Sequence, residues 1–198
     1  MLVKDKKVDY MVEYTGWHGT TKKAKDSILQ EGKFNITDSS KSKRVPNDLG
    51  DGIYFFADYI NSDPKKIAFG YAKKYKSKII QRDNTSVACL KAKIEAKDEE
   101  VLDLDEPSIR EYLMQLNERY SYEISQKFKS ANNDGAKERG NQDGYLVNIL
   151  TDNQRDIEIK VVTMATYTPL SNMPSVSNFP NCREICVRDN DSIEIIEE

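Results

Sequence analysis

The stretch Leu49-Gly50-Asp51-Gly52-Ile53-Tyr54-Phe55-Phe56 decides how this chain can fold. Its last four residues, 53–56, form a short apolar run that ends before Asp58, which predicts a buried strand. Gly50 and Gly52 stand just before the run, so the backbone there can make a tight approach to another group. A dinucleotide-binding Rossmann turn is not indicated, because no third glycine follows at the required spacing and no strand-helix-strand pattern surrounds it.

Strands and helices are expected to alternate irregularly on both sides of this stretch. Capping residues and apolar spacing predict helices from Thr20 or Thr21 to about Glu31, from Ser62 or Asp63 with Pro64 at the first position, and after Pro107. Strands are expected at residues 10–15, 88–94, 100–104, 145–150, 157–167, 184–188 and 193–196, with loops at 35–50, 131–144 and 168–182. The last two strands are expected to form a hairpin or a bent pair. Strands interrupted by segregated helices predict an α+β fold, and the absence of repeats or a linker predicts a single domain over 1–198.

Composition favours a soluble cytoplasmic protein, although a delivered effector would have the same composition. No apolar run is long enough to cross a bilayer, and no secretory signal is expected in residues 1–14. The three cysteines match no zinc pattern, so no metal is expected. The net charge of −3 is uneven: residues 1–93 hold 19 Lys and Arg against 11 Asp and Glu, and residues 94–198 hold 11 against 22. The basic first part would suit a dinucleotide or nucleic acid, or simply be a solvated face.

Four residues stand out as candidates for chemistry. His18 is the only histidine and lies before Gly19, ahead of a helix cap, where a loop could approach a ligand. Tyr54 could stack on a flat ring or belong to the core, and the same two alternatives hold for Tyr71 on its helix. Glu184 begins a late strand, where it could be a functional carboxylate or a solvated one.

The order of three motifs resembles a known enzyme family. A His-Gly-Thr at residues 18–20, a Gly-x-Gly-Ile-Tyr-Phe at 50–55 and the late strand-borne Glu184 are similar to the motifs of NAD-dependent ADP-ribosyltransferases of the His-Tyr-Glu class, which includes diphtheria toxin and the poly(ADP-ribose) polymerases. The resemblance implies a split antiparallel β-sheet core with flanking helices. Residues 98–150 have no counterpart among these motifs, which suggests a family-specific insertion involved in the choice of target or partner.

The resemblance also implies a role for each matched residue. In such enzymes the histidine, here His18, hydrogen-bonds the adenosine-side ribose of NAD, and the glycine after it, here Gly19, offers its backbone to the nicotinamide carboxamide. The tyrosine of the second motif, Tyr54, and a second tyrosine, which we place at Tyr71, stack on the nicotinamide ring. Glu184 would stabilise the positive charge that builds on the ribose as the nicotinamide leaves. The implied NAD site comprises His18, Gly19, Thr20, Gly52, Tyr54 and Tyr71, with His18, Tyr54 and Glu184 as the catalytic set; Glu158 and Glu194 are alternative acids.

The implied reaction is transfer of ADP-ribose from NAD to a protein or nucleic-acid acceptor, with release of nicotinamide. Single-unit transfer by a bacterial or phage-related toxin or defence protein is expected, because no regulatory domain accompanies the motifs, and an antitoxin or immunity protein would then be a partner. Hydrolysis of NAD is a close variant. The alternative is a non-catalytic module that keeps the fold to bind a nucleotide or a partner.

Overall fold

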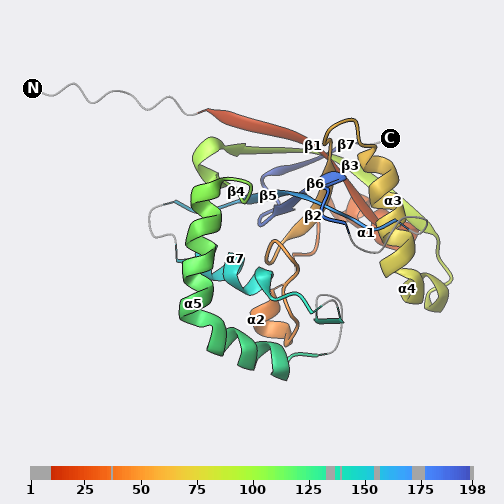
Figure 1. Cartoon of the computed structure of the whole chain (residues 1–198). Helices are drawn as coiled ribbons and strands as arrows, with labels where there is room; N and C mark the ends of the chain where they lie inside the picture. Colours follow the sequence, from red (N-terminus) through yellow and green to blue (C-terminus); the bar gives the residue numbers. More distant parts are fainter. Residues whose placement is uncertain are drawn as a thin grey trace, which may run out of the picture.

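The computed structural model of the chain describes residues 10–36, 38–132, 137–138, 140–153, 157–170 and 177–196. It combines one β-sheet with helices gathered between strands, which confirms the α+β class (Figure 1). In chain order the elements are β1 (Met11–Thr21), α1 (Lys22–Glu31), α2 (Ser39–Ser42), β2 (Ile53–Ala57), α3 (Pro64–Tyr75), α4 (Ser77–Arg82), β3 (Val87–Lys97), η1 (Asp98–Glu100), β4 (Val101–Asp103), α5 (Pro107–Ser130), α7 (Asp143–Asp152), β5 (Val161–Thr166), β6 (Cys182–Val187) and β7 (Ile193–Ile196).

The sheet is divided near its middle. Its strand order is β4-β5-β6-β2-β1-β3-β7, and β1 meets β2 at a single residue pair, Trp17 with Phe56. By contrast, β1 pairs with β3 along its whole length, from Met11 to Thr21. The sheet is mixed rather than antiparallel throughout, because at one edge β4 runs parallel to β5. A parallel pair needs a long crossover connection, and α5 and α7 lie in the chain between these two strands.

The side chains of β2 alternate between two faces of the sheet, as the pleat of a strand requires. Ile53 and Phe55 pack in one cluster with residues of β3, β5 and β6, against which α1 packs its Ile28 and Leu29. Tyr54 and Phe56 point to the other face, which also carries Glu184 of β6 and is called the Tyr54 face below. On the Tyr54 face, α3 covers the Phe56 end and α5 with α7 covers the Cys186 end (Figure 1).

Local signals in the sequence place the helix ends correctly. The Thr21 hydroxyl accepts a hydrogen bond from the Ala24 amide, and Gly32 ends α1 in the left-handed conformation with φ of 66°. Asp63 caps α3 in the same way, with Pro64 at the first helical position. The stripe predicted after Pro107 is confirmed as α5, whose Leu116 and Ile124 are buried. Within the described part of the chain, no helix combines the length and the apolar character needed to cross a membrane.

The strand expected at residues 145–150 is wrong, because this segment lies inside α7. Its apolar residues also fit helical spacing, and Leu146, Val147 and Leu150 are buried on one side of the helix. Gly144 lets α7 approach another segment closely: a Cβ at this position would overlap the carbonyl oxygen of Asn47. The burial of one side of this segment against other elements therefore decides for a helix here.

Four smaller expectations also need correction. Strands β6 and β7 do not pair with each other, because β6 lies between β2 and β5 whereas β7 pairs with β3 at the opposite edge. Strand β1 continues through His18, which was expected in a turn after residue 15. Strand β5 begins only at Val161, and the expected loop at 35–50 contains the single turn α2. Residues 133–136 and 139 of one expected loop and 171–176 of another lie outside the described residues.

Candidate active site

Glu184 lies on the Tyr54 face, between two groups of covering side chains. It is half-buried and stands opposite Phe56 on β2 and Met164 on β5. Phe56 belongs to the cluster under α3, and Met164 packs against the cluster under α5 and α7. The preceding residue, Arg183, points to the other face, where Asp103 and Asp105 accept its hydrogen bonds at 3.4 and 3.0 Å. The adjacent guanidinium is therefore engaged by carboxylates other than Glu184.

A threonine that the sequence did not single out holds the Glu184 carboxylate. The Thr168 hydroxyl donates to Glu184 Oε1 at 2.9 Å, and only 2% of Thr168 is exposed. Asn181 fixes Thr168 in turn, since its side chain accepts from the Thr168 amide at 2.8 Å and donates to the Thr168 carbonyl at 2.9 Å. Both residues fall in the predicted 168–182 loop, whose Ser, Thr and Asn content was the only sequence signal for them.

Tyr54 and Tyr71 approach the same region from two elements. Burial raises the pKa of the Tyr54 phenol well above its ordinary value, and the nearby Cys186 and Glu184 raise it further. The effect of Glu184 on this pKa agrees with the strand register, which places both side chains on the Tyr54 face. The Tyr71 ring of α3 lies 5.5 Å from the Phe56 ring. Phe56 is in turn the residue of β2 that pairs with Glu184 of β6. Tyr54 and Glu184 therefore share one face of the sheet, and Tyr71 packs on Phe56, the residue paired with Glu184.

The Tyr54 hydroxyl closes the loop that precedes its own strand. It accepts a hydrogen bond from the Leu49 amide and donates one to the Gly50 carbonyl, both at 2.8 Å. The sequence predicted a stacking ring, whereas the structure adds a structural role for the hydroxyl. Gly50 adopts φ of 86° in this loop, a conformation that glycine adopts without steric penalty.

We expect Tyr54→Phe to lower the free energy of unfolding by about 1–3 kcal/mol, because it leaves a buried amide and a carbonyl without their partner. Tyr145→Phe is the matched control, since the partly buried Tyr145 makes no side-chain hydrogen bond among the described residues. Urea unfolding of the two variants checks this. Equal losses would show that the loop does not depend on the Tyr54 hydroxyl.

His18 is joined to Tyr54 through the backbone. Its Nδ1 lies 2.8 Å from the Tyr54 carbonyl oxygen, and because a carbonyl can only accept, Nδ1 must carry the proton. In the neutral ring Nε2 is then an acceptor. The ring packs beside Phe34 and Phe55 at centroid distances of 5.3 and 5.8 Å. His18 thus bridges β1 and β2 where the two halves of the sheet separate.

Burial lowers the pKa of His18 from 6.5 to about 4; the hydrogen bond to Tyr54 opposes the shift, and the charge of Lys76 adds to it. The unfolded chain binds a proton here below pH 6.5, whereas the folded chain resists protonation until about pH 4. We therefore expect the free energy of unfolding to fall as the pH drops from 6.5 toward 4. Because His18 is the only histidine, NMR titration of its ring protons checks the shift directly. A midpoint near 6.5 in the folded chain would contradict it.

Of the other predicted NAD residues, Gly19 and Thr20 are buried within the fold and Gly52 is half-buried. Gly19 lies in β1 under α3, where a Cβ would overlap the carbonyl oxygen of Ala68, so its placement in an open loop was wrong. Thr20 is 3% exposed, and a Cβ on Gly52 would overlap Cys186 and Val187. The side chain of Thr20 is therefore not offered to solvent. Any contact of Gly19 or Gly52 with a ligand would be made by the backbone.

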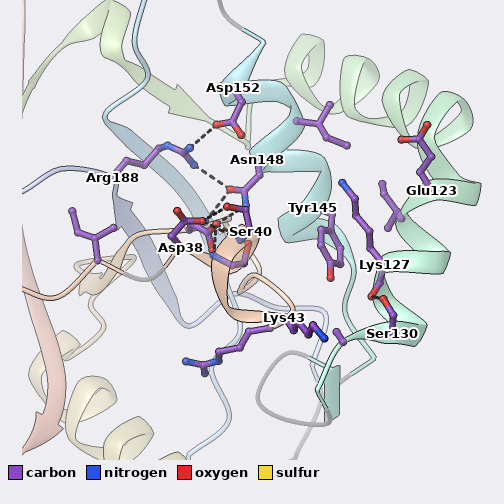
Figure 2. A pocket seen from close by; sticks show the side chains of 17 residues that line it. Asp38, Ser40, Lys43, Glu123, Lys127, Ser130, Tyr145, Asn148, Asp152 and Arg188 are labelled. Carbon is purple, nitrogen blue, oxygen red and sulfur yellow. Dashed lines mark hydrogen bonds and ion pairs between the residues drawn. The ribbon is translucent and has the colours of Figure 1, made fainter.

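The same glycine loop is held from its other side by a polar network in a cavity of about 750 Å³ (Figure 2). The Asp51 carboxylate accepts hydrogen bonds from the Ser39 amide and hydroxyl and from the Asn148 amide group, at 2.7 to 3.0 Å. Asn148 Oδ1 accepts from the Asp51 amide and from Arg188, which also binds Asp152. This network joins the loop to α7 and to the end of β6.

Three cavities formed by the described residues do not coincide with the predicted site. The one in Figure 2, a groove beside Trp17 and a smaller cavity of about 290 Å³ beside Met164 have linings that contain none of His18, Tyr54, Tyr71 and Glu184. Leu170 lies against Gly70 of α3, close enough that a Cβ there would overlap it. The segment from Thr168 to Leu170 therefore packs over part of the Tyr54 face.

Comparisons of the chain with protein-family models and with curated proteins gave no match. Within the described residues, no group of three or more His, Cys, Asp or Glu side chains is arranged to hold a metal ion. The described residues thus provide a half-buried carboxylate at Glu184, Tyr54 on the same sheet face, Tyr71 packed on the neighbouring Phe56, and His18 bonded to the Tyr54 carbonyl.

Proposed function

We propose that this chain transfers ADP-ribose from NAD to a macromolecular acceptor and releases nicotinamide. The observation that carries the proposal is the position of Glu184, held by Thr168 on the same sheet face as Tyr54 and Tyr71. These residues are far apart in the sequence, and the fold brings them together. Of the three motif side chains, Tyr54 and Glu184 share one face of the sheet, whereas the His18 ring packs with Phe34 and Phe55 on the other face and reaches Tyr54 only at its backbone carbonyl.

The reaction requires a carboxylate in this position. The bond between the nicotinamide nitrogen and the ribose carbon breaks, and its electron pair leaves with the neutral nicotinamide. Positive charge then builds on the ribose, and a nearby anion stabilises it. An acceptor nucleophile forms the new bond to the same carbon and loses its proton to the Glu184 carboxylate or to water. The hydrogen bond from Thr168 fixes the carboxylate without neutralising it.

The other residues have roles in binding NAD. The rings of Tyr71 and Tyr54 would stack on the nicotinamide. His18, with its proton on Nδ1, would accept a hydrogen bond from a ribose hydroxyl at Nε2. Among the described strands, β1 pairs with β2 only at Trp17, which leaves the backbone edge beyond it near Gly19 for the carboxamide. This opening is the division that the split sheet of an ADP-ribosyltransferase fold would need.

The segment 98–150 would then influence the choice of acceptor. Its helices α5 and α7 cover one side of the Tyr54 face, beside Met164 and Glu184. We extend the proposal to single-unit transfer by a cytoplasmic toxin or defence protein, with an antitoxin or immunity protein as partner.

One observation favours a second candidate, a non-catalytic module that binds a nucleotide or a partner. The Tyr54 hydroxyl is hydrogen-bonded to its own loop, and the Glu184 carboxylate is hydrogen-bonded to Thr168. None of the three cavities described above is lined by Tyr54 or Glu184. Such a module would bind NAD or a partner without consuming NAD. The two candidates therefore differ in whether nicotinamide is formed.

Incubation of the chain with adenine-labelled NAD and cell extract tests the proposal. We expect the label to appear in macromolecules. Either protease or nuclease treatment, depending on whether the acceptor is a protein or a nucleic acid, will convert the labelled material to small fragments. Formation of free ADP-ribose alone would indicate the hydrolytic variant. NAD that binds and stays intact with every extract would contradict the proposal and favour the non-catalytic module.

A further inference from the structure

The cavity shown in Figure 2 lies between α2, α5 and α7, and none of the predicted NAD residues belongs to its lining. Its volume of about 750 Å³ falls within the range of roughly 300–1,000 Å³ that is usual for small-molecule sites. Apolar side chains of Ile36, Ile124 and Ile149 and the ring of Tyr145 line it together with polar groups. The cavity is therefore large enough for a ligand of the size of a nucleotide.

Two ammonium groups at the edge of this cavity can meet an anion. Lys43 ends α2 and Lys127 lies in the last turns of α5, and both residues are exposed. Among the described residues, neither side chain has a hydrogen-bond or ion-pair partner. Glu123 is one turn from Lys127 on α5, yet the two form no ion pair, and Glu123 lies at the opposite end of the cavity from Lys43 (Figure 2).

The other carboxylates in the lining already have partners. Asp38 forms an ion pair with Lys41 at 2.9 Å. Asp152 forms one with Arg188, also at 2.9 Å. The Asp51 carboxylate accepts the three hydrogen bonds described above. These interactions offset most of the negative charge in the lining, so the two lysines can attract an anionic ligand.

Tyr145 of α7 adds an aromatic ring and a hydroxyl without a hydrogen-bond partner among the described residues. Burial raises the pKa of this phenol, and the charge of Asp51 raises it further, so the hydroxyl stays protonated and can donate to an anion. Figure 2 shows Lys43 on one side of this hydroxyl and Lys127 on the other. Lysine ammonium groups are common ligands of phosphate, and planar rings stack on aromatic side chains.

We propose that this cavity binds a nucleoside phosphate, with the base against the Tyr145 ring and the isoleucines and the phosphate held by the Tyr145 hydroxyl, Lys43 and Lys127. The apolar wall requires a ring in the ligand, and the three donors require an anion. The inference goes beyond the proposed reaction and does not depend on it, because the binding involves none of the residues that would hold or cleave NAD.

Isothermal titration calorimetry with adenosine 5′-monophosphate, in the absence of NAD, tests this inference. The test variant is Lys43→Ala/Lys127→Ala. The control is Lys33→Ala/Lys129→Ala, which removes the same charge from exposed positions outside the lining. We expect the test variant to bind the nucleotide at least about tenfold more weakly, because two charge-assisted contacts to the phosphate are lost. The control should stay within about twofold of the unaltered chain.

Separate parts of the ligand show whether both the ring and the phosphate contribute. We expect adenosine and inorganic phosphate each to bind at least about tenfold more weakly than the nucleotide. Tyr145→Leu keeps an apolar side chain but removes the ring and the hydroxyl, and should weaken nucleotide binding about fivefold or more. Circular dichroism confirms that the variants are folded.

Four results would overturn the inference. They are no nucleotide binding by the unaltered chain, equal loss in the test and control variants, inorganic phosphate or adenosine binding as tightly as the nucleotide, and loss of binding in a His18→Ala variant but not in the test variant. The last would place the nucleotide in the predicted NAD site. Failure of the other kinds would leave ADP-ribosyl transfer unaffected, because the cavity shares no residue with that site.

Discussion

Replacement of Glu184 by glutamine should lower the rate of nicotinamide release at least about a hundredfold while NAD affinity changes little. Glutamine has the same shape, and its carbonyl oxygen can still accept the hydrogen bond from Thr168. What it lacks is the negative charge, which matters only when the ribose becomes positive. Turnover measured by nicotinamide release, together with NAD binding measured by calorimetry, separates these two effects.

Glu158→Gln and Glu194→Gln are the matched controls for this prediction. Both side chains are exposed, and Glu194 belongs to β7 at the opposite edge of the sheet from β4. We expect both variants to keep near-normal release. If Glu184→Gln kept it and one of the others lost it, the assignment of the carboxylate would be wrong.

Gly19→Val should lower the free energy of unfolding by at least about 2 kcal/mol. Valine normally suits a strand, so without a steric conflict the change would be neutral or favourable. Here any Cβ would overlap the Ala68 carbonyl oxygen of α3, and backbone gives way less easily than a side chain. Because α3 carries Tyr71, NAD affinity should fall as well.

Thr15→Val is the control for that variant, since Thr15 is exposed in the same strand. We expect it to change the free energy of unfolding by no more than about 0.5 kcal/mol. Urea unfolding gives both values. A Gly19→Val protein as stable as the Thr15→Val protein would mean that α3 does not pack closely on Gly19.

Helix starts and one strand could be predicted from the sequence, because the residues that determine them lie within a few positions of each other. Thr21, Asp63 and Pro64 mark helix starts by chemistry within one turn, and the structure places helices there. The apolar run 53–56 became β2, because four large apolar residues in a row have few alternatives to a buried strand. These elements follow from short-range rules that hold in most folds.

The failures involve contacts between distant parts of the chain. The partners of β6 and β7 could not be derived from the short turn that joins them, since each strand pairs with a different part of the sheet. The helix at 143–152 depends on how its buried side packs against other elements. The spacing along the chain also gave no sign that Thr168 would bind Glu184 or that Tyr54 would bind its own loop. The roles of His18, Tyr54, Tyr71 and Glu184 in binding and cleaving NAD stay predictions.

The most direct test is proton NMR of NAD incubated with the purified, unaltered chain and with its Glu184→Gln variant, in the presence of cell extract freed of small molecules. If the chain cleaves the bond between nicotinamide and ribose, free nicotinamide will appear with the unaltered chain and at a far lower rate with the variant. NAD consumed at the same rate by both proteins, or by neither, would contradict ADP-ribosyl transfer at this site.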